Sequence, residues 1–236
     1  MYTEHMSFPN YLKEYISQDK EIVPINNTIY GIAERVDEQK KDALNKERKL
    51  LVVTGLSGAG KDSVVQGLVS ADKRFGWIKT CTTRSRRPEE NDDNDPYVRL
   101  TEEMFQTALK NGDVIESVEY AGHHYCSLSS LFREAYNFCE IPILRIDPKG
   151  ANFYTKMWRK NEGIFKDINL INVFVVPSSI ESLKERLLNR SGDPEFVIKR
   201  IQQTEIDIPF IGDAEYIAVN ETGKLKTVIS DLIQIF

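Results

Sequence analysis

Residues 50–68 read LLVVTGLSGAGKDSVVQGL, an apolar run that stops at a glycine-rich turn and continues into a helix-like pattern. The turn matches Gly-x-x-x-x-Gly-Lys and ends at Lys61, with a buried strand expected before it and a helix after it. Its glycines let successive backbone N–H groups point inward, and these donors form an anion site together with the N-terminus of the following helix. A plain turn between strand and helix would not need the lysine. The stretch therefore predicts a nucleotide phosphate-binding loop.

The residue after the lysine departs from the usual loop. Asp62 stands where such loops normally place a Ser or Thr hydroxyl that helps to hold Mg²⁺. A carboxylate is also an oxygen ligand for Mg²⁺, so Asp62 is the predicted metal ligand and Mg²⁺ the predicted cofactor. Ser63 is a poorer substitute because helix geometry turns it about 100° away. The predicted ATP-binding residues all lie in this loop: Gly55, Ser57, Gly58, Ala59, Gly60, Lys61, Asp62 and Ser63.

Strand-like and helix-like segments alternate from residue 50 to the end of the chain. INVFVV at 171–176 is typical of a buried strand, SIESLKERLLNR at 179–190 of a helix, and EYIAVN at 215–220 of a last strand. Strands that alternate with helices favour a mostly parallel sheet covered on both faces. The predicted fold class is therefore α/β, with three layers.

Residues 1–48 differ from the rest of the chain. After Pro24, apolar residues recur at nearly helical spacing, at Ile25, Ile29, Ile32, Val36, Ala43 and Leu44. The prediction is an N-terminal helical extension over 1–48 that packs on the core or on a second subunit. Residues 49–236 are the predicted main domain.

Composition narrows the classes of function. The chain has 236 residues and a formal net charge of −5, which argues against a dedicated nucleic-acid binder. No apolar stretch has the length of a membrane span, the first residues lack a signal pattern, and the cysteines form no CxxC pair. We expect a cytoplasmic monomer or homodimer whose partners are small-molecule nucleotides, without nucleic acid or membrane.

A second motif lies in TTRSRR at 82–87, where Arg84, Arg86 and Arg87 follow an expected strand. Arginine side chains match phosphate oxygens in bidentate geometry. Ordinary surface salt bridges are the alternative interpretation. The position after a strand is, however, where α/β folds bind ligands.

In their order and spacing, these blocks resemble the guanylate kinase family of P-loop nucleoside monophosphate kinases. The resemblance covers about residues 50–236 and rests on GLSGAGK at 55–61, TTRSRR at 82–87, Tyr97, VIESVEYAGHHY at 114–125 and ILRIDPKG at 143–150. It implies Mg²⁺-dependent transfer of a phosphoryl group from ATP to GMP, which gives GDP; acceptance of dGMP stays open. It also implies an acceptor-binding part over about 80–128 and a lid over about 188–204.

The family's motifs imply a role for several residues of this chain. The acceptor phosphate would be held by Arg84, Arg87, Tyr97 and Tyr125, and guanine by Thr80, Glu116, Ser127 and Asp147. A single carboxylate such as Glu116 can accept both N1–H and N2–H of guanine, and adenine lacks that donor pair. An exposed strand glutamate is the alternative for Glu116.

The resemblance also implies a catalytic set and a lid. The catalytic residues would be Lys61, Arg84, Arg190 and Arg200, because phosphoryl transfer depends on positioning and positive charge. Arg186 is a further lid candidate, although a glutamate on its own helix could pair with it instead. Asn220 resembles an asparagine that the family places near the adenine or the lid.

Several positions depart from the family pattern. Asp62 replaces a hydroxyl, Arg145 replaces an acid, Cys126 replaces a glycine and Thr80 replaces the more frequent serine. The acidic stretch PEENDDNDP at 88–96 makes the gap before Tyr97 about one residue longer. Two alternatives stay open: a related small-molecule kinase such as a ribose bisphosphate phosphokinase, and a non-catalytic guanylate-kinase-like module that binds a protein.

Overall fold

The fold is built around a mixed sheet of seven strands. The computed structural model describes residues 22–32, 48–86, 90, 95, 97–161 and 163–236. Within them the sheet runs in the order β1 (Ile22–Pro24), β2 (Ile29–Ile32), β11 (Tyr216–Asn220), β10 (Ile168–Pro177), β3 (Arg48–Gly55), β9 (Ile141–Arg145) and β4 (Phe75–Ile78). The five strands from β11 to β4 are parallel to one another, β2 is antiparallel to β11, and β1 is antiparallel to β2. The predicted mostly parallel α/β sheet is confirmed.

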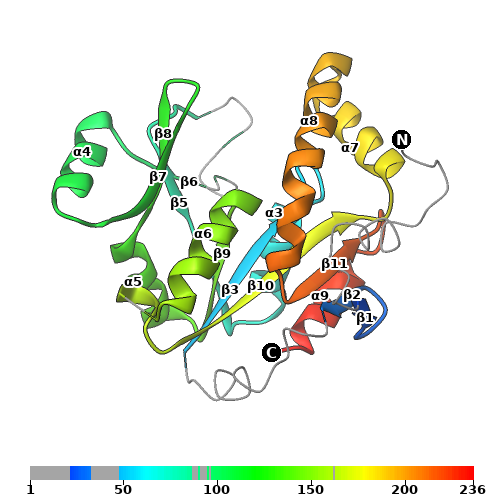
Figure 1. The fold of residues 1–236 in the computed structure, drawn as a ribbon, viewed down its shortest axis with the longest axis horizontal. Helices are drawn as coiled ribbons and strands as arrows, with labels where there is room; N and C mark the ends of the chain where they lie inside the picture. The colour runs from blue at the N-terminus through cyan, green and yellow to red at the C-terminus, as the bar shows by residue number, and fades with distance from the viewer. Residues whose placement is uncertain (1–21, 33–47, 87–89, 91–94, 96, 162) are drawn as a thin grey trace.

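Helices cover both faces of this sheet and make three layers (Figure 1). Successive residues of β3 point to opposite faces, as a strand requires. Leu51 and Val53 pack with α3 (Lys61–Ala71), α7 (Ile180–Ser191) and α9 (Leu225–Ile233). Leu50 and Val52 pack in a second cluster with α5 (Ser129–Phe138) and α6 (Pro148–Arg159). Burial of these side chains fixes the register of β3, which ends at the phosphate loop.

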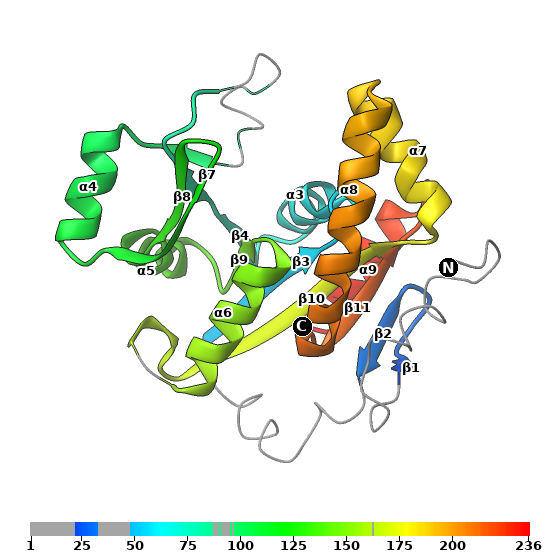
Figure 2. The same ribbon diagram turned by 45° about the horizontal axis from the view of Figure 1, so that its top comes forward.

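Two parts rise from the edge of the sheet where its parallel strands end (Figures 1 and 2). One part is a small sheet in the order β6 (Tyr97–Arg99), β5 (Thr80–Thr82), β8 (His123–Leu128) and β7 (Val114–Tyr120), covered by α4 (Glu102–Lys110). The other part pairs α7 with α8 (Pro194–Asp207), which continues into the 3₁₀ turn η3 (Ile208–Asp213). A short 3₁₀ turn, η2 (Gly163–Phe165), precedes β10.

The N-terminal prediction is wrong where the structure tests it. Ile29 and Ile32 lie in a strand, not in a helix, and both are fully buried. β2 extends the main sheet because Tyr30 pairs with Ile217 of β11. The three-residue spacing of Ile29 and Ile32 suits one face of a helix. Backbone pairing with the distant strand β11 makes the segment a strand instead. The remainder of the predicted extension, 1–21 and 33–47, lies outside the described residues.

Two strands of the small sheet had no counterpart among the predicted elements. The strand expected before Arg84 is divided between β4 and β5, which belong to different sheets. β8 returns from β7 through a turn at Ala121 and Gly122, both with positive φ. The pairing of β7 with β8 brings two predicted guanine-binding residues together. Among the described helices, none is long and apolar enough to cross a bilayer.

Candidate active site

The phosphate loop joins β3 to α3, and its glycines are required by backbone geometry. Gly55 has φ 131°, and a Cβ atom there would lie 2.1 Å from the carbonyl oxygen of Val175 in β10. Gly60 caps α3 in the left-handed region, with φ 92°. No other residue takes these conformations without strain. The loop thus presents its backbone N–H groups at the N-terminus of α3, as an anion site needs.

Lys61 lies at the start of α3 and folds back over this loop. Its Nζ donates to the carbonyl oxygens of Gly55 at 2.8 Å and Leu56 at 2.9 Å. Burial, with the nearby positive charge of Arg145 as the second cause, lowers the pKa of Lys61 from 10.5 to about 8. A phosphate near Nζ would replace the two carbonyls and favour the charged amine.

Two side chains hold the phosphate loop through the carbonyl oxygen of Ala59. Asn220, at the end of β11, donates to the carbonyl oxygen of Ala59 at 2.8 Å. Arg186 of α7 donates to the carbonyl oxygens of Ala59 at 3.3 Å and Asn220 at 2.7 Å, and to the Thr222 hydroxyl at 3.1 Å. Arg186 therefore joins the loop to the end of β11. Its sequence neighbourhood did not reveal these partners, because they lie far away along the chain.

The predicted guanine-binding residues gather around the hairpin of β7 and β8. Glu116 stands opposite Ser127, whose hydroxyl donates to the Glu116 Oε1 at 2.9 Å. Burial raises the pKa of Glu116, the Ser127 hydrogen bond opposes that shift, and the charge of Asp147 adds to it. Asp147 is exposed and caps α6 by accepting from the backbone N–H of Gly150 at 2.8 Å. Thr80 begins the neighbouring strand β5.

A buried hydroxyl was missed by the sequence analysis at this hairpin. Tyr154 of α6 is fully buried, and its hydroxyl has no hydrogen-bond partner among the described residues. Burial raises the pKa of Tyr154, its interaction with the Ser127 hydroxyl opposes that shift, and the charge of Glu116 adds to it. The phenol therefore lies close to both Ser127 and Glu116.

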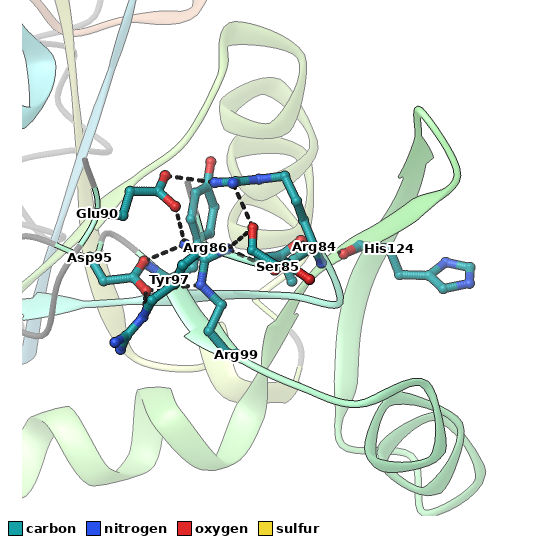
Figure 3. Close-up of polar contacts among 9 residues, drawn as sticks. Arg84, Ser85, Arg86, Glu90, Asp95, Tyr97, Arg99 and His124 are labelled. Atoms are coloured by element: carbon teal, nitrogen blue, oxygen red, sulfur yellow. Dashed lines mark hydrogen bonds and ion pairs between the residues drawn. The ribbon is translucent and has the colours of Figure 1, made fainter. Parts of the chain in front are cut away.

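The arginine cluster is engaged with carboxylates, as Figure 3 shows. Arg84 Nη2 lies 2.6 Å from Glu90 Oε1, and Arg99 Nη2 lies 2.7 Å from Glu90 Oε2. The hydrogen bond with Glu90 raises the pKa of Arg84. Glu90 thus bridges Arg84 and Arg99, two strongly basic side chains that are largely shielded from solvent.

Asp95 is the second acid of this network (Figure 3). Its side chain is only 2% exposed and accepts from Arg99 at 2.7 Å and from Arg86 at 2.8 Å. The Arg99 hydrogen bond is the main cause that lowers the pKa of Asp95, against the effect of burial. Arg99, Glu90 and Asp95 were not predicted as site residues. Their signal was the unusually acidic stretch at 88–96, which lies between the arginines at 84–87 and Arg99.

Two tyrosines of the predicted phosphate clamp lie together. The rings of Tyr97 and Tyr125 meet edge to face, with centroids 5.7 Å apart. The Arg84 guanidinium carbon lies 5.9 Å from the centre of the Tyr97 ring. The structure therefore brings three of the four predicted phosphate ligands together. Arg87, the fourth, lies outside the described residues.

The lid arginines differ in their surroundings. Arg200 of α8 places its guanidinium 5.1 Å from the centre of the Phe196 ring. Arg190, in the last turn of α7, is exposed. Asp207, at the end of α8, has its pKa raised by burial, which the Lys61 and Arg200 charges oppose. Asp207 was missed by the sequence analysis, and it accepts from Gln203 Nε2 at 2.9 Å.

Two departures from the family pattern meet in space. Arg145 Nε, at the end of β9, lies 2.8 Å from Asp62 Oδ1 at the start of α3. The Arg145 guanidinium carbon also lies 5.5 Å from the centre of the Tyr97 ring. Arg145 therefore lies between the phosphate loop and the predicted acceptor clamp.

This ion pair bears on the predicted metal ligand. Mg²⁺ requires near-octahedral oxygen coordination and in kinases is bound largely by substrate phosphates. One Asp62 oxygen faces the Arg145 guanidinium, and the described residues contain no group of three His, Cys, Asp or Glu that could hold a metal. These residues do not form a site that would hold Mg²⁺ by protein ligands alone. The assignment of Asp62 as a ligand stays a prediction.

Comparison with known proteins agrees with this geometry. The guanylate kinase family model matches residues 47–235. A guanylate kinase from Thermotoga maritima is 32% identical over 174 residues, which cover 73% of this chain and 79% of that protein. One from Streptococcus agalactiae serotype III is 34% identical over 182 residues, 76% of this chain and 82% of that protein. The crystal structure of guanylate kinase from Anaplasma phagocytophilum has a similar fold, with a TM-score of 0.55 at 20% identity, covering 80% and 85% of the two chains.

Proposed function

The chain belongs to the guanylate kinase family, and we propose that it transfers the γ-phosphoryl group of ATP to GMP, giving ADP and GDP, with the residue roles set out below. The observation that carries this assignment is the placement of two sites at one edge of the main sheet. The loop at Lys61 ends β3, and the pair of Glu116 and Ser127 lies in the adjoining small sheet. A donor triphosphate and an acceptor purine can therefore approach each other there.

On the donor side, the backbone of the loop binds the triphosphate and Lys61 neutralises its β- and γ-phosphates. Lys61 leaves the carbonyl oxygens of Gly55 and Leu56 when it turns to the phosphates. Mg²⁺ that accompanies the triphosphate would supply additional positive charge there. Asn220 and Arg186 keep the loop in its binding conformation through Ala59.

On the acceptor side, the phosphate of GMP is held by Arg84, Tyr97 and Tyr125, with Arg87 as a further predicted ligand. Arg84 must exchange Glu90 for a phosphate oxygen, because the two now form an ion pair. Arg99 and Asp95 retain their own contacts and support the strand that carries Tyr97. A phosphate oxygen of GMP can then attack the γ-phosphorus of ATP, and ADP is the leaving group.

Guanine is recognised through its polar edge. The Glu116 carboxylate accepts N1–H and N2–H, and Ser127 orients it at 2.9 Å. Thr80 and Asp147 complete the polar surroundings of the base. Adenine would leave the Glu116 carboxylate without both donors, and an unpaired buried charge carries a large penalty.

The lid supplies the remaining charge. Arg190 and Arg200 approach the phosphates when α7 and α8 close, and they stabilise the negative charge of the transition state. Closure also excludes water, so that GMP is the acceptor. The limits of 80–128 as the acceptor-binding part and 188–204 as the lid belong to this proposal. So do residues 1–48 as an extension whose strand β2 joins the main sheet, a cytoplasmic location, and a monomer or homodimer.

Release of ADP across a panel of acceptors tests the function. We expect turnover with GMP and, at equal concentration, at least about 100-fold lower kcat/KM with AMP, CMP or UMP. Turnover of a ribose phosphate with no turnover of GMP would support the sugar-phosphate kinase. ATP binding by calorimetry without any turnover would support the non-catalytic module.

A further inference from the structure

The ion pair of Arg145 and Asp62 connects the two halves of the site. We propose that Arg145 is a further catalytic residue that contacts the phosphoryl group in transit, and that Asp62 is the positioning residue that orients it. This inference rests on the proposed function, since it assigns a role within phosphoryl transfer. The site would thereby hold an arginine inside the main domain, in addition to those of the lid.

The position of Arg145 is the first argument. Its Nε lies 2.8 Å from Asp62 Oδ1, at the first turn after the phosphate loop. Its guanidinium carbon lies 5.5 Å from the centre of the Tyr97 ring. Asp62 belongs to the donor side, and Tyr97 to the proposed acceptor clamp. A group between these two residues is placed where donor and acceptor phosphates must meet.

The unused donors of Arg145 are the second argument. Guanidinium carries five N–H donors, and its fork matches phosphate oxygens. Nε lies in the ion pair with Asp62 but without the alignment of a hydrogen bond, and the terminal nitrogens have no hydrogen-bond partner among the residues that the structure describes. The side chain as a whole is 15% exposed, but of its unpartnered nitrogens only Nε is fully buried, so the terminal nitrogens face solvent. The terminal nitrogens are thus available to an anionic ligand.

The surrounding charges are the third argument. Lys61 and Arg145 are close enough for the arginine to disfavour protonation of the lysine. Two neighbouring cations are unfavourable unless an anion lies between them. Asp62 offsets part of this repulsion, but its side chain is 60% exposed and therefore well solvated. A triphosphate would relieve the remainder, which is the electrostatic arrangement that phosphoryl transfer needs.

Kinetics of Arg145→Ala test the proposal, with Arg159→Ala as the matched control. Arg159 faces Asp213 at 4.0 Å and lies at the far end of α6, away from the loop. We expect Arg145→Ala to lower kcat about 100-fold, while the separate dissociation constants of ADP and GMP change less than about threefold. Arg159→Ala should stay near wild type. A kcat for Arg145→Ala within about threefold of wild type would overturn the catalytic role.

A double-mutant cycle tests the part played by Asp62. Asp62→Asn alone should lower kcat about tenfold, because the arginine loses its orienting charge. In the Arg145→Ala background, Asp62→Asn should lower kcat little further, since Asp62 acts through Arg145. Losses that simply add would contradict the positioning role. The charge exchange Asp62→Arg with Arg145→Asp should also stay impaired, because it keeps a salt bridge but moves the guanidinium.

A structure of the wild-type protein decides the question even if the variants fold poorly. The ligand would be a bisubstrate analogue that joins adenosine and guanosine through a chain of phosphates. We expect an Arg145 terminal nitrogen at about 3 Å from a phosphate oxygen. A guanidinium that points away from the chain would overturn the proposal. If the wild-type protein does not phosphorylate GMP at all, the proposed function fails; if it does and Arg145 stays remote, only this inference fails.

Discussion

The donor and acceptor halves of the site bind phosphate in different ways. The donor loop relies on backbone groups fixed by glycine geometry and by Asn220 and Arg186 behind it. The acceptor half relies on arginine side chains that are paired with Glu90 and Asp95 before any nucleotide arrives. The donor half is therefore preorganised, whereas the acceptor half must exchange partners. Substitutions should damage transfer most on the donor side and tune affinity on the acceptor side.

Lys61→Ala should give the largest effect. Loss of the charge at the β- and γ-phosphates is expected to lower kcat about 1000-fold and to weaken ATP binding, while the dissociation constant of GMP changes little. ADP release and calorimetry with each nucleotide measure this. Lys73→Ala, on an exposed position just after α3, is the control. Weaker GMP binding with unchanged ATP binding would contradict the division into two halves.

Glu116→Gln should come next. The amide still accepts one hydrogen bond, but its NH₂ group faces a guanine donor, so kcat/KM for GMP is expected to fall about 100-fold. ATP affinity should stay unchanged. Glu119→Gln lies on the same strand at an exposed position and serves as the control. Equal damage from both variants would assign the loss to the strand, not to the carboxylate.

Asp95→Asn should mainly affect stability. Arg99 and Arg86 would lose the charge of a buried partner, and we expect a loss of about 2 kcal/mol in the free energy of unfolding, measured by denaturant titration. Asp167→Asn, at an exposed position, should change it little.

The pH dependence follows from the lowered pKa of Asp95. The charged carboxylate stabilises the folded state above its unfolded pKa of 3.8, and this contribution is lost as the pH falls through the lower folded pKa. The difference in the free energy of unfolding between wild type and Asp95→Asn should therefore shrink below about pH 4. A difference that grows with acidity would show that Asp95 is not the stabilising charge.

Glu90→Gln should have the smallest effect, and it tests the exchange of partners. Arg84 would no longer be held by a charged competitor, so the dissociation constant of GMP is expected to fall about threefold. Glu103→Gln, exposed on α4, is the control. A clear weakening of GMP binding would instead make Glu90 an essential support for Arg84.

The sequence was most informative where the chemistry is local. β3, the loop and α3 were predictable because strand pattern, glycines and lysine are contiguous in residues 50–68. The resemblance also implied the acceptor set, and the structure brings Glu116 together with Ser127, and Tyr97 with Tyr125.

Features that depend on distant pairing were not predictable in this way. Ile29 and Ile32 have helical spacing, but β11 draws them into a strand. Arg186 has glutamates on its own helix, but it binds carbonyl oxygens at Ala59 and Asn220 instead. Asp62 and Arg145 were separate departures in the sequence, and only the folded chain shows that they form one ion pair.

The most direct measurement is a crystal structure with GMP and a non-hydrolysable ATP analogue bound together. We expect the Glu116 carboxylate within hydrogen-bond distance, about 3 Å, of N1 and N2 of guanine, with Arg84 moved from Glu90 to the GMP phosphate and the loop backbone little changed. A Glu116 carboxylate turned away from the purine, with Arg84 still on Glu90, would contradict the division between a fixed donor half and an exchanging acceptor half.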